Sequence, residues 1–412
     1  MFGRCATGKG RTAALLCSLA LFGCGSHHQA SGGSAPPNPG TGAPREMPLK
    51  YYNHFPFNNV YTIGVQVGGQ TLESVLDTGS SNLLVLGDAA HCPACTNEYG
   101  YQSTYSPAAG SQALTTSWSM NFAPIGAAQV QGYQDTVSWD DLTLPGFKFG
   151  LVTAEKGIPN IWGIAYQSLA SPYGAPQTPL FDALAQAGSL KNQFSLRLCG
   201  LKAGSNITLG GFDAALVDKM AQVQWTPITA KIWYSVTVER MYGGATPNAA
   251  AAWSWAPAAS DRVIVDSGTN PLVLPAAQMA PLVAWLRSVA TQNGLTLPAD
   301  FWPTAAGPGG YAALSAADVA KFPPLLVDLA GTSDAQKTIT LSIAPSVYFQ
   351  TREDGQRYLG IEPGQGSVYI LGTVFLENYV VLHDRGVAGL MPDPSARLGF
   401  YPIDGLCDVP AA

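Results

Sequence analysis

The chain has 412 residues and a formal net charge of −6, which is enough length for two ordinary domains. Charged residues make up only 12% of it, about half of the roughly 25% typical of soluble domains. A net negative chain with so few charges lacks the excess of Lys and Arg that binding to nucleic acid or to anionic lipid requires. Few charges, with many Gly, Ser, Thr and Ala, favour an exported globular protein.

The N-terminus has the pattern of an export signal. Arg4, Lys9 and Arg11 precede an apolar stretch from Ala13 to Phe22, which is too short to span a bilayer. The run ends in Leu-Phe-Gly-Cys24, which resembles the lipobox of bacterial lipoproteins, where the Cys is lipidated and begins the mature chain. We therefore expect a signal peptide over 1–23 and lipidation at Cys24. The alternative is an ordinary signal peptide that contains a Cys.

A low-complexity segment follows. Residues 24–46 are rich in Ser, Gly, Pro and Ala and cannot bury enough apolar surface to offset their ordering entropy, so we expect a flexible tether. The lipid would hold the protein at the bacterial outer membrane or the periplasmic face. Without lipid, the protein would be secreted.

The remaining chain predicts an all-β protein. Short runs rich in Val, Ile, Tyr and Thr lie between turn residues, and they are 61–67, 74–77, 83–86, 206–209, 235–239, 263–265, 337–343 and 379–382. Helical spacing of apolar residues is confined to 179–187 and 275–290. Segments 242–261 and 301–313 predict loops, with Trp253 and Trp255 as partly buried anchors.

A weak internal repeat divides this region. Leu-Asp77-Thr-Gly-Ser recurs as Val-Asp266-Ser-Gly-Thr, about half the mature chain later. Each copy lies between two apolar strands. Each half later carries two apolar residues and a glycine, Gly163 or Gly372. The repeat predicts two related lobes that face each other, which we place at 47–222 and 223–412.

The repeated turn has a chemical logic. Gly79 and Gly268 let the chain turn tightly, and the hydroxyls of Ser80 and Thr269 can orient the neighbouring Asp. Thr78 and Ser267 can bond backbone across the lobe interface. Two carboxyls brought close together cannot both ionise, so one proton is shared. The charged Asp can then activate water while the neutral Asp polarises a carbonyl.

From about Met47 onward the chain resembles the pepsin family of aspartic proteases. Val-Leu-Asp77-Thr-Gly-Ser-Ser-Asn-Leu and Ile-Val-Asp266-Ser-Gly-Thr resemble its two active-site motifs. Trp-Gly-Ile-Ala-Tyr166 and His-Asp-Arg385 resemble later landmarks. The resemblance implies a bilobal fold with an interlobe sheet and a few short helices, catalysis by Asp77 and Asp266, peptide or protein substrates, and neither cofactor nor metal. We expect a monomer.

Four cysteines remain after the signal and Cys24. Cys92-Pro-Ala-Cys95 could be a redox motif or half of a zinc site. Only His91 is nearby as a further ligand and no thioredoxin-like pattern surrounds the motif, so a loop-closing disulfide is favoured. Cys199 and Cys407 would form a second bond, which the resemblance makes plausible because both segments share the interlobe sheet in that family.

The predicted active-site cover departs from the family. Its flap hairpin carries a Tyr that contacts a Trp after the first motif. Here Leu84 stands at the Trp position, and within 118–134 the best match for the Tyr is Phe122. The family's long basic prosegment has no counterpart between the tether and Met47, so we expect no zymogen or weak autoinhibition.

Two other functions compete with a protease. One is a pepsin-fold binding lipoprotein without useful catalysis, which the altered flap favours and the two intact Asp motifs oppose. The other is a β-sandwich surface protein whose Asp turns bind calcium. It is disfavoured because Ca²⁺ takes about six to eight oxygen ligands and each turn offers one carboxylate.

Overall fold

The computed structural model describes residues 42–54, 57–95, 103–122, 126–170, 177–188, 190–244, 251–333, 336–386 and 395–408. All of these belong to one compact unit. The predicted signal peptide, Cys24 and most of the predicted tether lie outside the described residues. Within them, no helix combines the length and apolar character needed to cross a membrane.

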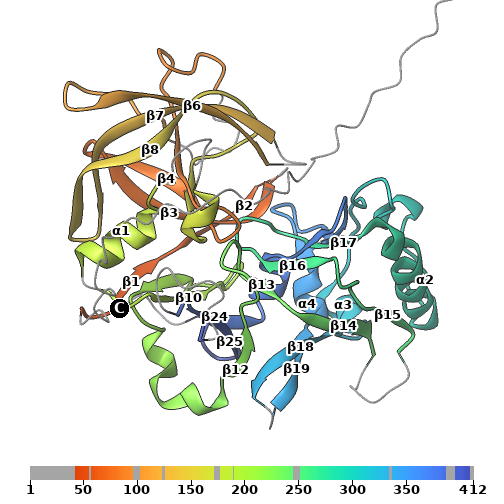
Figure 1. Cartoon of the computed structure of the whole chain (residues 1–412). Coiled ribbons are helices and arrows are strands. Elements are labelled where there is room, and N and C mark those ends of the chain that lie inside the picture. The colour runs from red at the N-terminus through yellow and green to blue at the C-terminus, as the bar shows by residue number, and fades with distance from the viewer. Residues whose placement is uncertain are drawn as a thin grey trace, which may run out of the picture. The chain divides into compact units, whose positions relative to one another are not determined.

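The N-terminal lobe is built on an eight-stranded sheet in the order β2-β3-β4-β9-β5-β8-β7-β6, seen at the upper left of Figure 1. Its strands are β2 Lys50–His54, β3 Phe57–Val67, β4 Gln70–Asp77, β5 Leu83–Leu86, β6 Gln112–Phe122, β7 Gly126–Trp139, β8 Leu142–Lys156 and β9 Ile161–Gly163. The short helices η1 Gln167–Leu169 and α1 Leu180–Ala187 follow.

A six-stranded sheet combines segments from both ends of the described chain, in the order β1-β11-β10-β24-β25-β12. Its strands are β1 Arg45–Pro48, β10 Gln193–Arg197, β11 Asn206–Leu209, β12 Gln224–Pro227, β24 Tyr379–Asp384 and β25 Arg397–Pro402, and the 3₁₀ helix η2 Ala214–Gln222 lies between β11 and β12. This is the interlobe sheet that the sequence resemblance implies.

The C-terminal lobe contains a five-stranded sheet, β13-β16-β23-β17-β22, a four-stranded sheet, β15-β14-β18-β19, and the pair β20-β21. The strands are β13 Ser235–Val236, β14 Val238–Gly243, β15 Trp253–Trp255, β16 Arg262–Val265, β17 Leu272–Pro275, β18 Leu325–Ser333, β19 Gln336–Ile343, β20 Phe349–Thr351, β21 Arg357–Leu359, β22 Ile361–Gly364 and β23 Val368–Leu371. The helices are α2 Ala276–Gln292, η3 Ala299–Phe301, α3 Ala316–Val319, α4 Pro345–Tyr348 and α5 Thr373–Leu376.

The expected mostly-β, bilobal fold is therefore correct, and two local expectations need correction. The predicted tether extends to residue 46, but β1 begins at Arg45, where it pairs with Leu209 of β11. Segment 242–261 is not wholly a loop, because β15 pairs with β14. Trp253 and Trp255 of β15 are 4% and 7% exposed, so they are core residues. A strand of three residues has too short a pattern to stand out from a loop.

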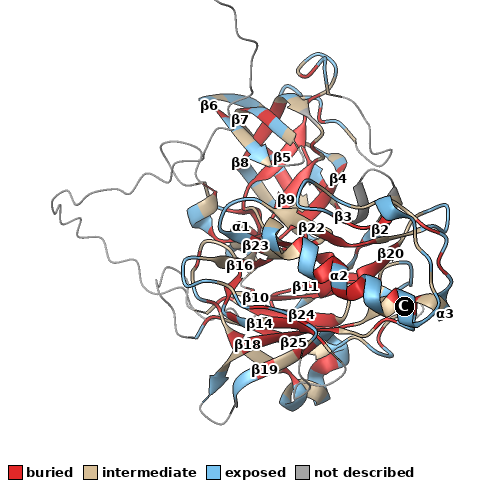
Figure 2. Ribbon diagram, turned by 90° about the vertical axis from the view of Figure 1, so that its right-hand side faces the viewer, coloured by how far each residue is buried: buried red, intermediate tan, exposed pale blue. Residues whose placement is uncertain are grey.

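One large apolar core runs through the described chain from the N-terminal strands to β25. Figure 2 shows buried residues concentrated along the sheets, with exposed residues on the outer face of α2 and in the loops. The sulfur atoms of Cys92 and Cys95, and those of Cys199 and Cys407, lie at disulfide distance. The second pair ties the segment after β10 to the segment after β25.

Candidate active site

The end of β4 presents the first carboxylate. Asp77 is the last residue of that strand, and the chain turns back at once through Gly79. The backbone N–H of Gly79 donates to Asp77 Oδ1 at 2.7 Å, and the Ser80 hydroxyl donates to Asp77 Oδ2. The carboxylate is therefore held by its own turn at both oxygens, and only 7% of the residue is exposed.

The second turn repeats this arrangement after β16. The backbone N–H of Gly268 donates to Asp266 Oδ1 at 2.8 Å, and the Thr269 hydroxyl donates to Asp266 Oδ2 at 2.8 Å. Asp266 is 6% exposed. The two copies of the sequence motif thus have equivalent hydrogen bonds.

Residues between the Asp and the Gly join the two turns. The backbone N–H of Thr78 donates to Ser267 Oγ at 3.1 Å, and the N–H of Ser267 donates to Thr78 Oγ1 at 2.9 Å. Each hydroxyl also donates to a carbonyl on the opposite strand, Thr78 to Val265 and Ser267 to Leu76. These four buried bonds fix the two turns against each other.

The carboxyls face each other across this junction. A methyl group added at Gly79 would lie 2.5 Å from Asp266 Oδ2, and one at Gly268 would strike the Asp77 carboxylate. Only glycine leaves room for the opposing carboxyl. Burial, then the charge of Asp77 and a hydrogen bond with it, raises the pKa of Asp266 well above its ordinary value. Asp266 therefore keeps a proton under conditions that ionise an exposed carboxyl.

A glycine supports each turn from behind. Gly163 of β9 lies opposite Asp77 in a parallel pairing with β4, and a Cβ there would lie 2.5 Å from the backbone N of Ser81. Gly372 follows β23, which runs parallel to β16. A Cβ there would lie 2.5 Å from the Thr269 carbonyl oxygen. The repeated glycines of the sequence thus lie in contact with the repeated turns.

The predicted flap is the hairpin of β6 and β7, in which Phe122 pairs with Gly126. Phe122 is partly buried and packs against an apolar cluster that contains Leu84. The two positions that depart from the family's Tyr and Trp therefore belong to the same apolar cluster. Residues 123–125, at the tip, lie outside the described part.

Sequence reasoning overlooked two polar residues beside the second turn. Asn270 Nδ2 donates to Thr373 Oγ1 at 3.1 Å, and the backbone N–H of Thr373 donates to the Thr269 carbonyl. The only feature of the sequence that could have pointed to Asn270 is that it directly follows the second Asp motif. His383, part of the His-Asp-Arg385 landmark, is fully buried and stacks on Phe194 with ring centroids 4.1 Å apart.

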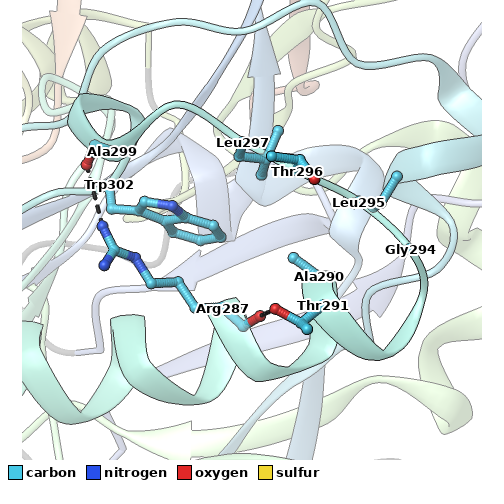
Figure 3. Close-up of a pocket in the computed structure, with 9 residues that line it drawn as sticks. All are labelled: Arg287, Ala290, Thr291, Gly294, Leu295, Thr296, Leu297, Ala299 and Trp302. Carbon is cyan, nitrogen blue, oxygen red and sulfur yellow. Dashed lines mark hydrogen bonds between the residues drawn. The ribbon is translucent and has the colours of Figure 1, made fainter.

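A cavity of about 400 Å³ lies elsewhere, at the C-terminal end of α2. Figure 3 shows Arg287 of α2 reaching toward the carbonyl of Ala299, beside Trp302. The cavity is lined by residues between 287 and 302, so none of the Asp turn residues contributes to it.

The two Asp turns face each other, and the hydroxyls of Thr78 and Ser267 each bond the opposite turn. This arrangement defines a class of two-lobed β proteins whose site is a pair of carboxyls. The chain belongs to the eukaryotic aspartyl protease family, whose model matches residues 60–390. It is similar to mouse gastricsin, with 28% identity over 79% of this chain and 77% of the relative. It is also similar to pepsin A from Rhinolophus ferrumequinum, with 27% identity over 80% of each.

Proposed function

We propose that this chain is an aspartic endopeptidase that hydrolyses peptide bonds with Asp77 and Asp266. The observation that carries the proposal is the pair of facing carboxyls, one of which is held neutral by burial and by its charged neighbour. Family membership and similarity to gastricsin and pepsin A support the same reaction.

The two carboxyls take different roles in this proposal. Asp77, as the carboxylate, accepts a proton from a water molecule that attacks the scissile carbonyl carbon. Asp266, as the acid, donates a hydrogen bond to the carbonyl oxygen and stabilises the negative charge that develops there. Ser80 and Thr269 keep each carboxyl oriented, and the exchanged bonds of Thr78 and Ser267 keep the distance between the carboxyls constant.

The substrate we propose is an extended peptide with large apolar residues flanking the cut. Support comes from the hairpin of β6 and β7, where Phe122 contacts an apolar cluster. An extended backbone exposes the amide to be cut and presents alternate side chains to apolar surfaces.

The test is cleavage of casein or denatured globin from pH 3 to 7. Asp77→Asn and Asp266→Asn should each lower the rate by at least ~10²-fold, since each removes an acid–base group, and a statine-type inhibitor should block the wild type. Asp300→Asn, at an exposed position, is the matched control and should retain activity. If folded wild-type protein cuts none of these substrates, a peptide-binding role for the same fold replaces the protease proposal.

We also propose that the chain is exported, cut before Cys24 and anchored to a membrane by a lipid on Cys24. Separately, we propose that the boundary between the two lobes lies between residues 222 and 223. The sequence motif at Leu21–Cys24 supports the anchor. Metabolic labelling with palmitate should mark the wild type and not Cys24→Ser. Equal labelling of both would exclude a lipid at Cys24.

A further inference from the structure

The cavity beside α2 results from the way this helix ends. The chain reverses at Gly294, whose φ of 69° lies in the left-handed region that favours glycine. The backbone N–H of Gly294 donates to the Thr291 carbonyl at 3.0 Å, and that of Leu295 donates to the Ala290 carbonyl at 2.9 Å. The segment after the turn therefore runs back beside the last turns of α2, and the cavity of about 400 Å³ lies between the two (Figure 3).

Arg287 brings a positive charge to this cavity. Its Nη2 donates to the Ala299 carbonyl at 3.1 Å, and its guanidinium lies 5.7 Å from the centroid of the Trp302 ring. A guanidinium has five N–H donors, so most of those of Arg287 stay available. Within the described part of the chain no carboxylate pairs with Arg287, whereas the buried Arg385 is paired with Asp182. The charge at the cavity therefore has no counter-ion from the described residues.

Trp302 supplies a second unused donor. Only 4% of this residue is exposed, and its ring is held by a T-shaped contact with Phe301, with centroids 5.1 Å apart. Among the residues that the structure describes, its indole N–H has no hydrogen-bond partner. That nitrogen is not sealed in the interior as the indole nitrogen of Trp162 is. Because the ring lines the cavity, the N–H is a free donor at the cavity wall, close to Arg287 (Figure 3).

The rest of the cavity wall is apolar or uncharged. Ala290, Leu295 and Leu297 line it together with the Trp302 ring, and Thr296 adds a hydroxyl at an exposed position. None of the described lining residues is acidic. Apolar walls beside one unpaired cation suit a ligand that has an apolar body and a single negative charge.

Two nearby sources of negative charge do not cancel that of Arg287. The C-terminal end of a helix carries a partial negative charge on its free carbonyls, but the backbone N–H groups of Asn293, Gly294 and Leu295 donate to carbonyls of the last turn of α2. Asp300 follows Ala299 in the chain, but it is exposed and does not line the cavity, so solvent screens its charge. Arg287 is therefore the charged group that a ligand in the cavity meets.

We propose that this cavity binds a monocarboxylate with a compact apolar body. The carboxylate accepts two hydrogen bonds from the Arg287 guanidinium and one from the indole N–H of Trp302, and the apolar body lies against Leu295 and Leu297. The cavity volume of about 400 Å³ is near the lower end of the roughly 300–1,000 Å³ of small-molecule sites, so the ligand is small. Two sources have this chemistry: the C-terminal residue of a peptide and a free short-chain organic acid.

The experiment titrates the full chain with N-acetyl-phenylalanine and with hexanoate at pH 7 in a calorimeter. The chain carries Asp77→Asn and Asp266→Asn, which prevent self-cleavage. At least one acid should bind with a Kd of about 1 mM or tighter, and the tighter of the two identifies the source. The amide of N-acetyl-phenylalanine, which has the same body without the charge, should bind at least ~10-fold more weakly.

The matched variants are two arginines that each lie beside a tryptophan. Arg287→Gln should weaken binding of the acid at least ~10-fold. Arg262→Gln, whose guanidinium lies 5.2 Å from the Trp233 ring centroid away from the cavity, should leave the Kd unchanged. The proposal is overturned if neither acid binds at about 10 mM, if the amide binds as tightly as the acid, or if Arg287→Gln binds as tightly as the unsubstituted arginine.

The indole N–H of Trp302 reports on the contact directly. In a ¹H–¹⁵N spectrum, the indole resonance that Trp302→Phe removes should move to lower field as the acid is added, because a charge-assisted hydrogen bond forms there. A resonance that does not move would contradict the proposed contact.

A second pair of variants covers the case in which Arg287→Gln does not fold. Thr296→Glu places a negative charge at the exposed edge of the cavity and should weaken binding at least ~10-fold by like-charge repulsion, whereas Thr296→Gln should bind as the unsubstituted chain does. Equal affinities for the two would contradict the site. None of these measurements depends on proteolytic activity, so the carboxylate site and the proposed function can fail separately.

Discussion

The two Asp turns have the same hydrogen bonds but different surroundings. In each, a glycine N–H and a hydroxyl hold the carboxylate, and a parallel strand lies beside it. Behind the first turn, the Ser81 hydroxyl donates to the Tyr166 carbonyl. Behind the second, Asn270 bonds Thr373, which leads through α5 to Glu377.

This comparison separates what the repeated motif determines from what its environment determines. The motif sets the position of each carboxyl, because its glycine and hydroxyl act within the turn. Burial and neighbouring charge set which carboxyl holds the proton, and they favour Asp266. Two nearly identical turns therefore give their carboxyls unequal proton affinities, as the proposed acid and base roles require.

The largest expected effect tests whether the glycines behind the two turns are equivalent. Gly163→Ala and Gly372→Ala should each lower the free energy of unfolding by more than ~3 kcal/mol, because the new methyl would collide with backbone of the adjacent turn. Chemical denaturation of both variants measures this. Gly307→Ala is the control, since nothing lies within 4 Å of a Cβ there. If only one of the two Gly→Ala variants kept wild-type stability, the two glycines would not be equivalent.

A smaller effect is expected at the exchanged hydroxyls. Thr78→Ala and Ser267→Ala each leave a buried backbone N–H and a carbonyl unpaired, at a cost of about 2–4 kcal/mol. Both should also lower kcat, because the spacing of the carboxyls relaxes. Thr78→Ser and Ser267→Thr keep the hydroxyl and serve as matched controls. A large loss of stability for Thr78→Ala with none for Ser267→Ala would show that the two hydroxyls do not contribute equally.

A buried histidine in the six-stranded interlobe sheet is expected to lower the stability of the whole fold in acid. Burial, then the charge of Arg385, lowers the pKa of His383 to about 3. The unfolded chain protonates this histidine below about pH 6.5 and the folded chain does not, so stability falls from there toward pH 3. His383→Phe, which retains a ring against Phe194, should stabilise the protein by up to ~3 kcal/mol at pH 4 and leave it nearly unchanged at pH 8. A thermal melt at both pH values measures the difference, and equal shifts at both would contradict it.

Sequence alone predicted the short-range features well. The Asp turns, their supporting hydroxyls and the Cys92–Cys95 pair each depend on a few adjacent residues or on a repeated pattern. The Cys199–Cys407 pair was expected from the family resemblance. The helices predicted over 179–187 and 275–290 lie within two residues of the observed bounds of α1 and α2. The longest strands, β7 and β8, were not predicted, because Gly, Gln and charged residues interrupt their alternation.

Contacts between distant segments could be predicted only where the repeated motif or the family resemblance pointed to them. The Tyr61 hydroxyl donates to Glu377 across 316 positions, and neither residue lies in a motif. Leu84 and Phe122 were matched through the family resemblance, and only packing shows that they share one apolar cluster. The sequence describes local chemistry, whereas burial, which shifts the pKa values of Asp266 and His383, is a property of the folded chain.

The smallest expected effect concerns the predicted flap, which is the hairpin of β6 and β7 in the N-terminal lobe. Phe122→Ala should lower kcat/KM about tenfold through loss of apolar contact. Phe122→Tyr should change it less than about threefold, because the residue at the family's Trp position is Leu84, whose side chain has no N–H to donate to the new hydroxyl. Asn121→Ala, at the exposed neighbour, is the control, and initial rates on one peptide substrate measure all three. If Phe122→Tyr instead raised kcat/KM by more than tenfold, the hydroxyl would have a partner other than position 84. The apolar contact would then be a weakened form of the family's flap and not a replacement for it.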